Sequence, residues 1–159
     1  MTTRMSKLGI ALALCTAGVL TAVPASAADT KDLNVTASVT GVCKFKSSAA
    51  DTLAFGALDP SVGTDKTVST NVLYWCTKGV TTNTVTAGNG LNFAGGKRNM
   101  KDPVSGDVIP YTLAVTDSGT PGGPSVDLTA AVSGTVLGLD YTGKAAGSYA
   151  DTVVLTVNP

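Results

Sequence analysis

Hydrophobic and small polar residues alternate along much of this 159-residue chain, a pattern typical of β-strands with one buried face. The clearest early run has four apolar members, Leu33, Val35, Ala37 and Val39. The alternation predicts a strand over residues 33–39. It does not decide whether that strand belongs to the domain core or forms a flexible arm.

Further apolar runs predict strands at residues 68–76, 80–87, 109–115 and 149–157, one or two strands within 126–139, and shorter apolar stretches at 43–45 and 53–58. In the first of these runs Val72, Tyr74 and Cys76 share one face, opposite Leu73 and Trp75. Turn-forming residues separate the runs, and no segment has a helical period. The pattern predicts an all-β fold of seven or eight short strands, as in a β-sandwich.

Three local features add to this expectation. Gly88-Asn89-Gly90 follows a predicted strand and is expected to be a hairpin turn rather than a phosphate loop, because no further glycine and no helix follow at the required places. Residues 95–106 are polar and glycine-rich, with no predicted strand. Pro110 indicates an edge position or the beginning of a strand.

The N-terminus has the pattern of a secretion signal. Arg4 and Lys7 precede an apolar stretch over residues 8–23, and the small residues 25–27 form a cleavage site after Ala27. The stretch is short for a membrane anchor, the first alternative. The second, a lipoprotein modified at Cys15, is disfavoured because Leu14 stands where a small residue is needed. Residues 1–27 are therefore predicted to be a signal peptide, and the protein is expected to be exported.

The composition of the remaining chain narrows the function. The whole sequence has no His, Glu or Gln, so every acidic residue is Asp. After residue 27, nine basic and eleven acidic residues remain, a net charge of −2. This balance disfavours a nucleic-acid partner. The lack of His excludes Ser-His-Asp and Cys-His catalytic centres and removes the usual zinc ligand.

Cys43 and Cys76 are the two cysteines left in the exported chain. A redox or metal pair would need closer spacing or further ligands, so a structural disulfide is predicted instead.

Other candidate sites have simpler explanations. The carboxylate pairs Asp102 with Asp107 and Asp140 with Asp151 could form an acid–base site, but Asp beside Gly or Pro is typical of turns. Tyr74 and Trp75 could stack on a sugar, yet packing against the disulfide is favoured. No catalytic, cofactor or metal site and no small-molecule substrate is predicted.

Several short motifs occur in a characteristic order. They are Gly41-Val42-Cys43, Leu53-Ala54-Phe55-Gly56 with Asp59-Pro60, Cys76-Thr77-Lys78-Gly79, Asn99-Met100 after Lys97-Arg98, Ile109-Pro110-Tyr111, and Gly147-Ser148-Tyr149-Ala150-Asp151-Thr152 before residues 153–157. Together they resemble the spore coat protein U domain family, which includes pilins of archaic (Csu-type) chaperone–usher pili. The chain departs from that pattern in ending on Asn158-Pro159 rather than on an aromatic residue, which bears on contact with a chaperone.

The resemblance implies an immunoglobulin-like β-sandwich that lacks its last strand, over residues 41–159. Residues 28–40 would be a donor strand, with Leu33, Val35, Ala37 and Val39 filling the groove of another subunit. The acceptor groove and chaperone contact would lie at Val153, Leu155 and Val157. Expected partners are other copies or related pilins, a periplasmic chaperone and an outer-membrane usher, and the product is a surface fibre for adhesion and biofilm formation.

Two other function classes remain as alternatives. One is a self-contained secreted β-sandwich binding or coat protein, which would keep residues 33–39 in its own sheet. The other is an enzyme, which the missing His disfavours.

Overall fold

The structure, a computed structural model, describes residues 27–159. The predicted signal peptide, apart from Ala27, and the lipoprotein alternative at Cys15 therefore lie outside the described residues. Residues 27–42 contain no helix or strand, and the side chains of Leu33, Val35 and Val39 are each 85% exposed. From Ser38 to Pro159 the chain forms one compact unit.

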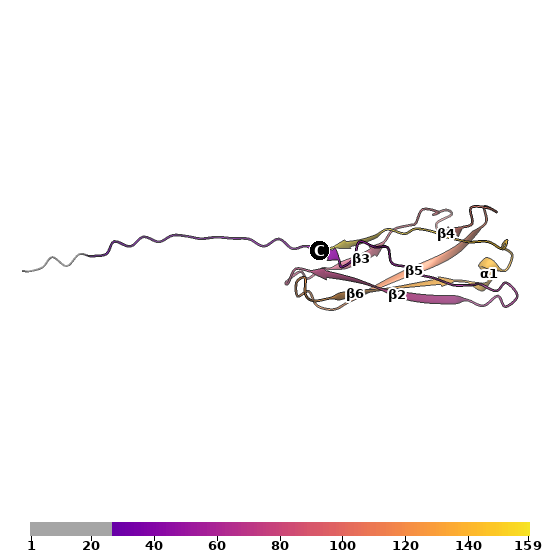
Figure 1. The fold of residues 1–159 in the computed structure, drawn as a ribbon, viewed down its shortest axis with the longest axis horizontal. Coiled ribbons are helices and arrows are strands. Elements are labelled where there is room, and N and C mark those ends of the chain that lie inside the picture. Colours follow the sequence, from indigo (N-terminus) through magenta and orange to yellow (C-terminus); the bar gives the residue numbers. More distant parts are fainter. Residues whose placement is uncertain (1–26) are drawn as a thin grey trace, which may run out of the picture. The chain divides into compact units, whose positions relative to one another are not determined.

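The regular secondary structure of that unit is almost entirely antiparallel β-strand (Figure 1). The larger sheet has five strands in the order β1 (Cys43–Phe45), β2 (Lys66–Cys76), β6 (Leu128–Val136), β5 (Val108–Ser118) and β4 (Arg98–Lys101). The smaller sheet pairs β3 (Thr84–Ala87) with β7 (Leu155–Asn158). The fold is all-β and sandwich-like, which confirms the predicted class.

The long strand β5 belongs to two ladders. Its first four residues pair with β4, and its remainder, from Thr112 onward, pairs with β6. Pro110 lies near the beginning of the strand, where its missing N–H is least costly. From Thr112 onward, the edge of β5 opposite β6 has no neighbouring strand in the larger sheet.

The core contains two clusters of apolar side chains. The first lies beside the disulfide and includes Tyr74, Cys76, Val85 and Leu128. The second lies toward the short helix α1 (Gly138–Tyr141) and includes Phe55, Ile109, Tyr111, Val136 and Tyr141. Along β2, Val72, Tyr74 and Cys76 are buried, whereas Leu73 and Trp75 are more exposed, so the predicted faces of this strand are confirmed.

Gly134 in β6 makes the second cluster possible. A Cβ atom there would lie 2.7 Å from Leu53 Cδ2 and 3.0 Å from Phe55 Cζ. Any larger residue would push these two side chains away from the sheet, because real Cβ atoms do not approach so closely. The glycine therefore lets the segment that carries Phe55 lie directly on β6.

Several elements differ from the predictions. Strand β4 lies within residues 95–106, where no strand is predicted. The pattern gives no sign of it because a residue that β4 buries, Asn99, is polar and only 5% exposed. Residues 88–90 do not form the predicted hairpin turn, since β3 pairs with β7 and not with the following strand. The tight turn lies instead at Ala94–Lys97.

The helix α1 and the strand β7 (Leu155–Asn158) also differ from the predictions. One strand and the helix α1 occupy residues 126–139 and beyond, where no helix was expected. At Gly138 the chain approaches the backbone of Gly63 so closely that a side chain would not fit. Regular pairing in β7 begins only at Leu155, although a strand was predicted from residue 149.

Candidate functional site

The disulfide lies at one end of the sandwich and joins two neighbouring strands. Cys43 in β1 and Cys76 in β2 are direct partners in the ladder and are bonded through their sulfur atoms. Closing a loop with a sequence separation of 33 contributes about 4 kcal/mol in the chain-entropy estimate. The predicted disulfide is present, and it fixes β1 at the outer edge of the sheet.

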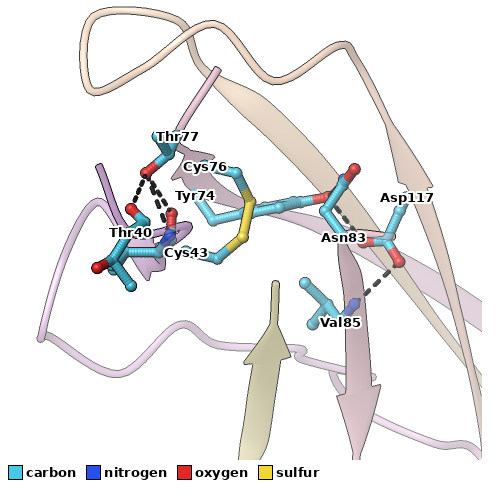
Figure 2. The surroundings of a disulfide bond; sticks show 9 residues. Thr40, Cys43, Tyr74, Cys76, Thr77, Asn83, Val85 and Asp117 are labelled. Carbon is cyan, nitrogen blue, oxygen red and sulfur yellow. Dashed lines mark hydrogen bonds between the residues drawn. A yellow bond between two sulfur atoms is a disulfide. The ribbon is translucent and has the colours of Figure 1, made fainter. Parts of the chain in front are cut away.

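Figure 2 shows how the tyrosine beside this disulfide reaches across the core. Asn83 Nδ2 donates to the Tyr74 hydroxyl at 2.8 Å, and that hydroxyl donates to Asp117 Oδ1 at 3.3 Å. The other oxygen of Asp117 accepts a bond from the Val85 N–H at 3.0 Å. Burial is the main cause of the raised Tyr74 pKa. These contacts make Tyr74 a core residue, while Trp75 points to the opposite face, so the two do not form one stacking platform.

Two adjoining cavities form an apolar groove in the same unit. Their volumes are about 550 Å³ and 290 Å³. Four residues line both cavities, namely Leu53, Phe55, Met100 and Tyr149. The groove therefore runs along one side of the domain between an early segment, residues 50–58, and a late segment, residues 149–157.

The early wall of the groove is extended chain without a ladder. Residues 50–58 have no regular secondary structure, and among the described residues none of their backbone groups has a hydrogen-bond partner in the protein. Their position is held by side chains instead. Phe55 is 8% exposed and stacks edge-on against Tyr111 with ring centroids 6.3 Å apart.

The late wall is hydrogen-bonded along only one of its two backbone edges. The Ala150 N–H and C=O pair with Lys101, the Thr152 C=O accepts from Leu91 N–H, and the Val154 C=O accepts from Gly88 N–H. Because successive backbone groups of an extended chain point to opposite edges, those of Val153 and Leu155 point away from these partners. Their side chains line the smaller cavity. This wall thus offers an unpaired strand edge to the groove.

One polar cluster lies inside the groove. Tyr111 Oη donates to Asp151 Oδ2 at 2.6 Å, and the Asn92 N–H and side-chain amide both donate to Asp151 Oδ1 at 3.1 Å. Burial and the adjacent carboxylate raise the pKa of Tyr111, so its hydroxyl keeps its proton. Gly90, with φ of 86°, brings its loop so close to Asp151 that a Cβ would collide with the carboxylate. The cluster fixes the 88–92 loop against the late wall.

The carboxylates do not form the acid–base pairs considered from the sequence. Asp102 Oδ2 accepts from both the backbone and the hydroxyl of Ser105, and these bonds lower its pKa. Asp107 Oδ2 accepts instead from the Ala145 N–H, and Asp151 accepts from Tyr111 and Asn92. Within residues 27–159, no group of three or more His, Cys, Asp or Glu side chains could hold a metal ion. The groove can bury apolar side chains and pair with a backbone.

The groove residues predicted from the sequence are only part of this wall. Val153 and Leu155 line the smaller cavity, whereas Val157 lies beyond it in β7, where it is opposite Val85 of β3 and packs against the first core cluster. The early wall and the Tyr111–Asp151 pair were missed. The alternation of Leu53 and Phe55 marked an inward face, but nothing in the sequence marked it as the side of a groove.

Comparison with known proteins adds one match. A family model described as the Spore Coat Protein U domain matches residues 29–156. No curated protein matches the chain. In the part of the chain that the structure describes, no helix is long and apolar enough to cross a membrane.

Proposed function

The chain belongs to the spore coat protein U domain family, and from this premise we propose that it is a structural subunit of a surface fibre, polymerised by donor-strand exchange. The family is associated with pilus and coat proteins and not with enzymes. In the proposed assembly, residues 28–40 of one copy fill the groove of the next copy.

The open groove is the observation that carries the proposal. Its two walls present unpaired backbone groups on either side of an apolar floor that includes Met100, Leu113 and Val132. Unpaired strand edges beside apolar surface favour the addition of another strand. An inserted strand would satisfy both edges and cover the floor at once, which a small ligand could not do.

The segment 28–40 has the properties that such a strand needs. Its apolar members alternate with polar ones, and Leu33, Val35 and Val39 are highly exposed. Burying three such side chains is worth roughly 5–9 kcal/mol, with Ala37 adding less. That gain is comparable to the whole stability of a typical domain, about 5–15 kcal/mol. Insertion would therefore decide whether a subunit is durably folded.

An unfilled groove also implies that other proteins assist assembly. Until a second copy arrives, the apolar floor and strand edges would favour aggregation. The family resemblance supplies a periplasmic chaperone to cover the groove and an outer-membrane usher to exchange it for the next subunit. We place the segment 1–27 as the signal that starts this route, and the cell surface as its end, with adhesion and biofilm formation as the use of the fibre.

A pair of double variants tests the proposal. Replacing Leu33 and Val35 by Asp puts charge on the face to be buried, whereas replacing Asn34 and Thr36 by Asp puts the same charge on the opposite face. Electron microscopy of cell surfaces should show fibres for the second variant and none for the first. Both proteins should bind the chaperone equally, because the groove itself is unchanged.

The main rival is a self-contained secreted binding or coat protein that keeps residues 28–40 for itself. It predicts a soluble monomer for the parent chain and no dependence on a chaperone. Normal fibres from the Leu33 and Val35 variant, or stable soluble monomer in cells without a chaperone, would favour that rival.

A further inference from the structure

Resting on the proposed function, the geometry points to one register for the inserted strand. We propose that Ala37 of one copy lies opposite Asp151 of the next, over the Tyr111–Asp151 pair. In this register Leu33 lies opposite Leu155, and Val35 lies opposite Val153. The polar pair then acts as the element that selects the register.

The direction of insertion follows from the ladders already present. Every strand pair in the domain is antiparallel, and antiparallel pairing is the more stable per residue. In an antiparallel pair, residues whose side chains face the floor lie directly opposite each other. Inward residues 33, 35, 37 and 39 must therefore face inward residues 149, 151, 153, 155 or 157. The possible registers differ in steps of two residues.

The polar pair separates these registers. Asp151 lines the smaller cavity, and its carboxylate already accepts three hydrogen bonds from Tyr111 and Asn92. A branched aliphatic side chain placed on it would gain no apolar contact there and would remove water from a charged group. Alanine has the smallest side chain among the four inward residues, so it sets the least apolar surface against the carboxylate.

The cavities favour the same choice. With Ala37 opposite Asp151, Leu33 and Val35 enter the smaller cavity, and Val39 lies opposite Tyr149, which also lines the larger one. Lys31 then lies opposite Val157, beyond both cavities, where its ammonium group can reach water.

Each of the two neighbouring registers places a larger apolar side chain on Asp151 and also occupies the cavities less favourably. A shift toward the disulfide puts Val39 on Asp151 and Leu33 opposite Val157, so the larger cavity stays empty. A shift the other way puts Val35 on Asp151 and brings Lys31 opposite Leu155, which lines the smaller cavity. A charged ammonium buried there without a partner is costly.

Cysteine pairs on the outward face report the register without disturbing the core. Val154 is 68% exposed, and residues 32, 34 and 36 are exposed as well. The proposed register makes Asn34 and Val154 directly opposite, in a pair whose Cα atoms lie about 4.5 Å apart, within reach of a disulfide. Diagonal neighbours lie about 7–8 Å apart, outside that reach.

The experiment compares three full-length double variants in assembled fibres. Each carries Val154→Cys together with Asp32→Cys, Asn34→Cys or Thr36→Cys. Non-reducing gels should show a covalent ladder for the Asn34 variant alone. A ladder from the Asp32 or Thr36 variant instead would overturn the register while leaving donor-strand exchange intact. No ladder from any of them, or a link only within one chain, would overturn both.

A second comparison tests the role of Ala37 directly. Ala37→Leu should make fibres release subunits about tenfold faster in denaturant, because overpacking at a filled site costs enough for that factor. Val39→Leu adds one methylene where the larger cavity has room, and should change the release little. Equal effects of the two variants would contradict the assignment of Ala37 to the polar pair.

Discussion

Strand β6 and the late wall of the groove have similar sequence patterns but different surroundings. In β6, Leu128, Ala130 and Val132 alternate with polar or small residues, and the strand is paired on both edges, with β2 and with β5. In the late wall, Val153 and Leu155 also face inward, although the residue between them is the exposed Val154, and only one edge is paired. The comparison teaches that alternation marks which side chains face inward, not whether the backbone has a neighbour.

The difference has an energetic consequence. A strand paired on both edges has its backbone groups satisfied and its inward side chains covered. The early wall has no paired edge and the late wall has only one, so their residues contribute less to the stability of a single subunit than their apolar character allows. An added strand would restore the missing contribution.

The largest effect is expected from giving the domain its own donor strand. Moving residues 28–40 behind Asn158 on a flexible linker should yield a stable monomer that forms no fibres. Its melting temperature should exceed that of a chain lacking residues 28–40 by about 15 °C or more, since roughly 5–9 kcal/mol of burial is restored. Calorimetry and gel filtration measure both outcomes. Equal melting temperatures would mean that the segment does not fill the groove.

A smaller effect is expected from matched leucine truncations on the two sides of the comparison. Leu128 is fully buried in β6, so Leu128→Ala should cost about 2–5 kcal/mol with or without a donor strand. Leu155 is half-buried, so Leu155→Ala should cost clearly less in a chain without the donor strand. Its cost should rise when the strand is attached. Denaturant unfolding of both backgrounds gives the four values, and an unchanged cost for Leu155→Ala would argue against insertion beside it.

The smallest effect concerns acid. Hydrogen bonds from Ser105 lower the pKa of Asp102 below its usual 3.8, so the ionised form stabilises the folded state. This contribution to stability is complete at pH values above the usual pKa of 3.8, and it is lost as the pH falls through the lowered pKa. Asp102 also packs against Gly147, which lines the larger cavity. Unfolding monitored by circular dichroism between pH 7 and pH 2 should therefore show a weaker acid dependence in Asp102→Asn than in the parent.

Asp59 provides the background for that measurement. Its pKa is also lowered, by hydrogen bonds from Ser61, and it contributes acid dependence in both proteins. The difference between the parent and Asp102→Asn isolates the contribution of the Asp102 carboxylate. Identical acid profiles of the two proteins would show that ionised Asp102 does not stabilise the folded state beside the larger cavity.

The sequence predicted the fold class well because the strong signals were local. Alternation in residues 68–76 and the two cysteines were enough to place a buried strand and a disulfide, and both are present. Strand β4 was missed because its inward residue, Asn99, is polar. Its side-chain amide donates to the backbone carbonyls of Asn92, Ala94 and Lys97, which no periodic pattern reveals.

The groove was only partly predictable for a different reason. The apolar character of Val153 and Leu155 can be seen in the sequence, but the missing neighbour on one edge depends on how residues 50–58 and 149–157 come together. The bond between Tyr111 and Asp151 spans 40 residues, and Gly90 takes part through its lack of a side chain. Such long-range contacts follow from the tertiary structure alone. The donor strand itself remains a prediction.

Amide hydrogen exchange in assembled fibres tests the central claim most directly. The backbone N–H groups of Val153 and Leu155 point into the groove, whereas amides in the middle of β6 are paired within the subunit. The β6 amides should be protected in both the free subunit and the fibre. The Val153 and Leu155 amides should exchange rapidly in the subunit and become protected only in the fibre. Rapid exchange at these two residues in intact fibres would contradict it.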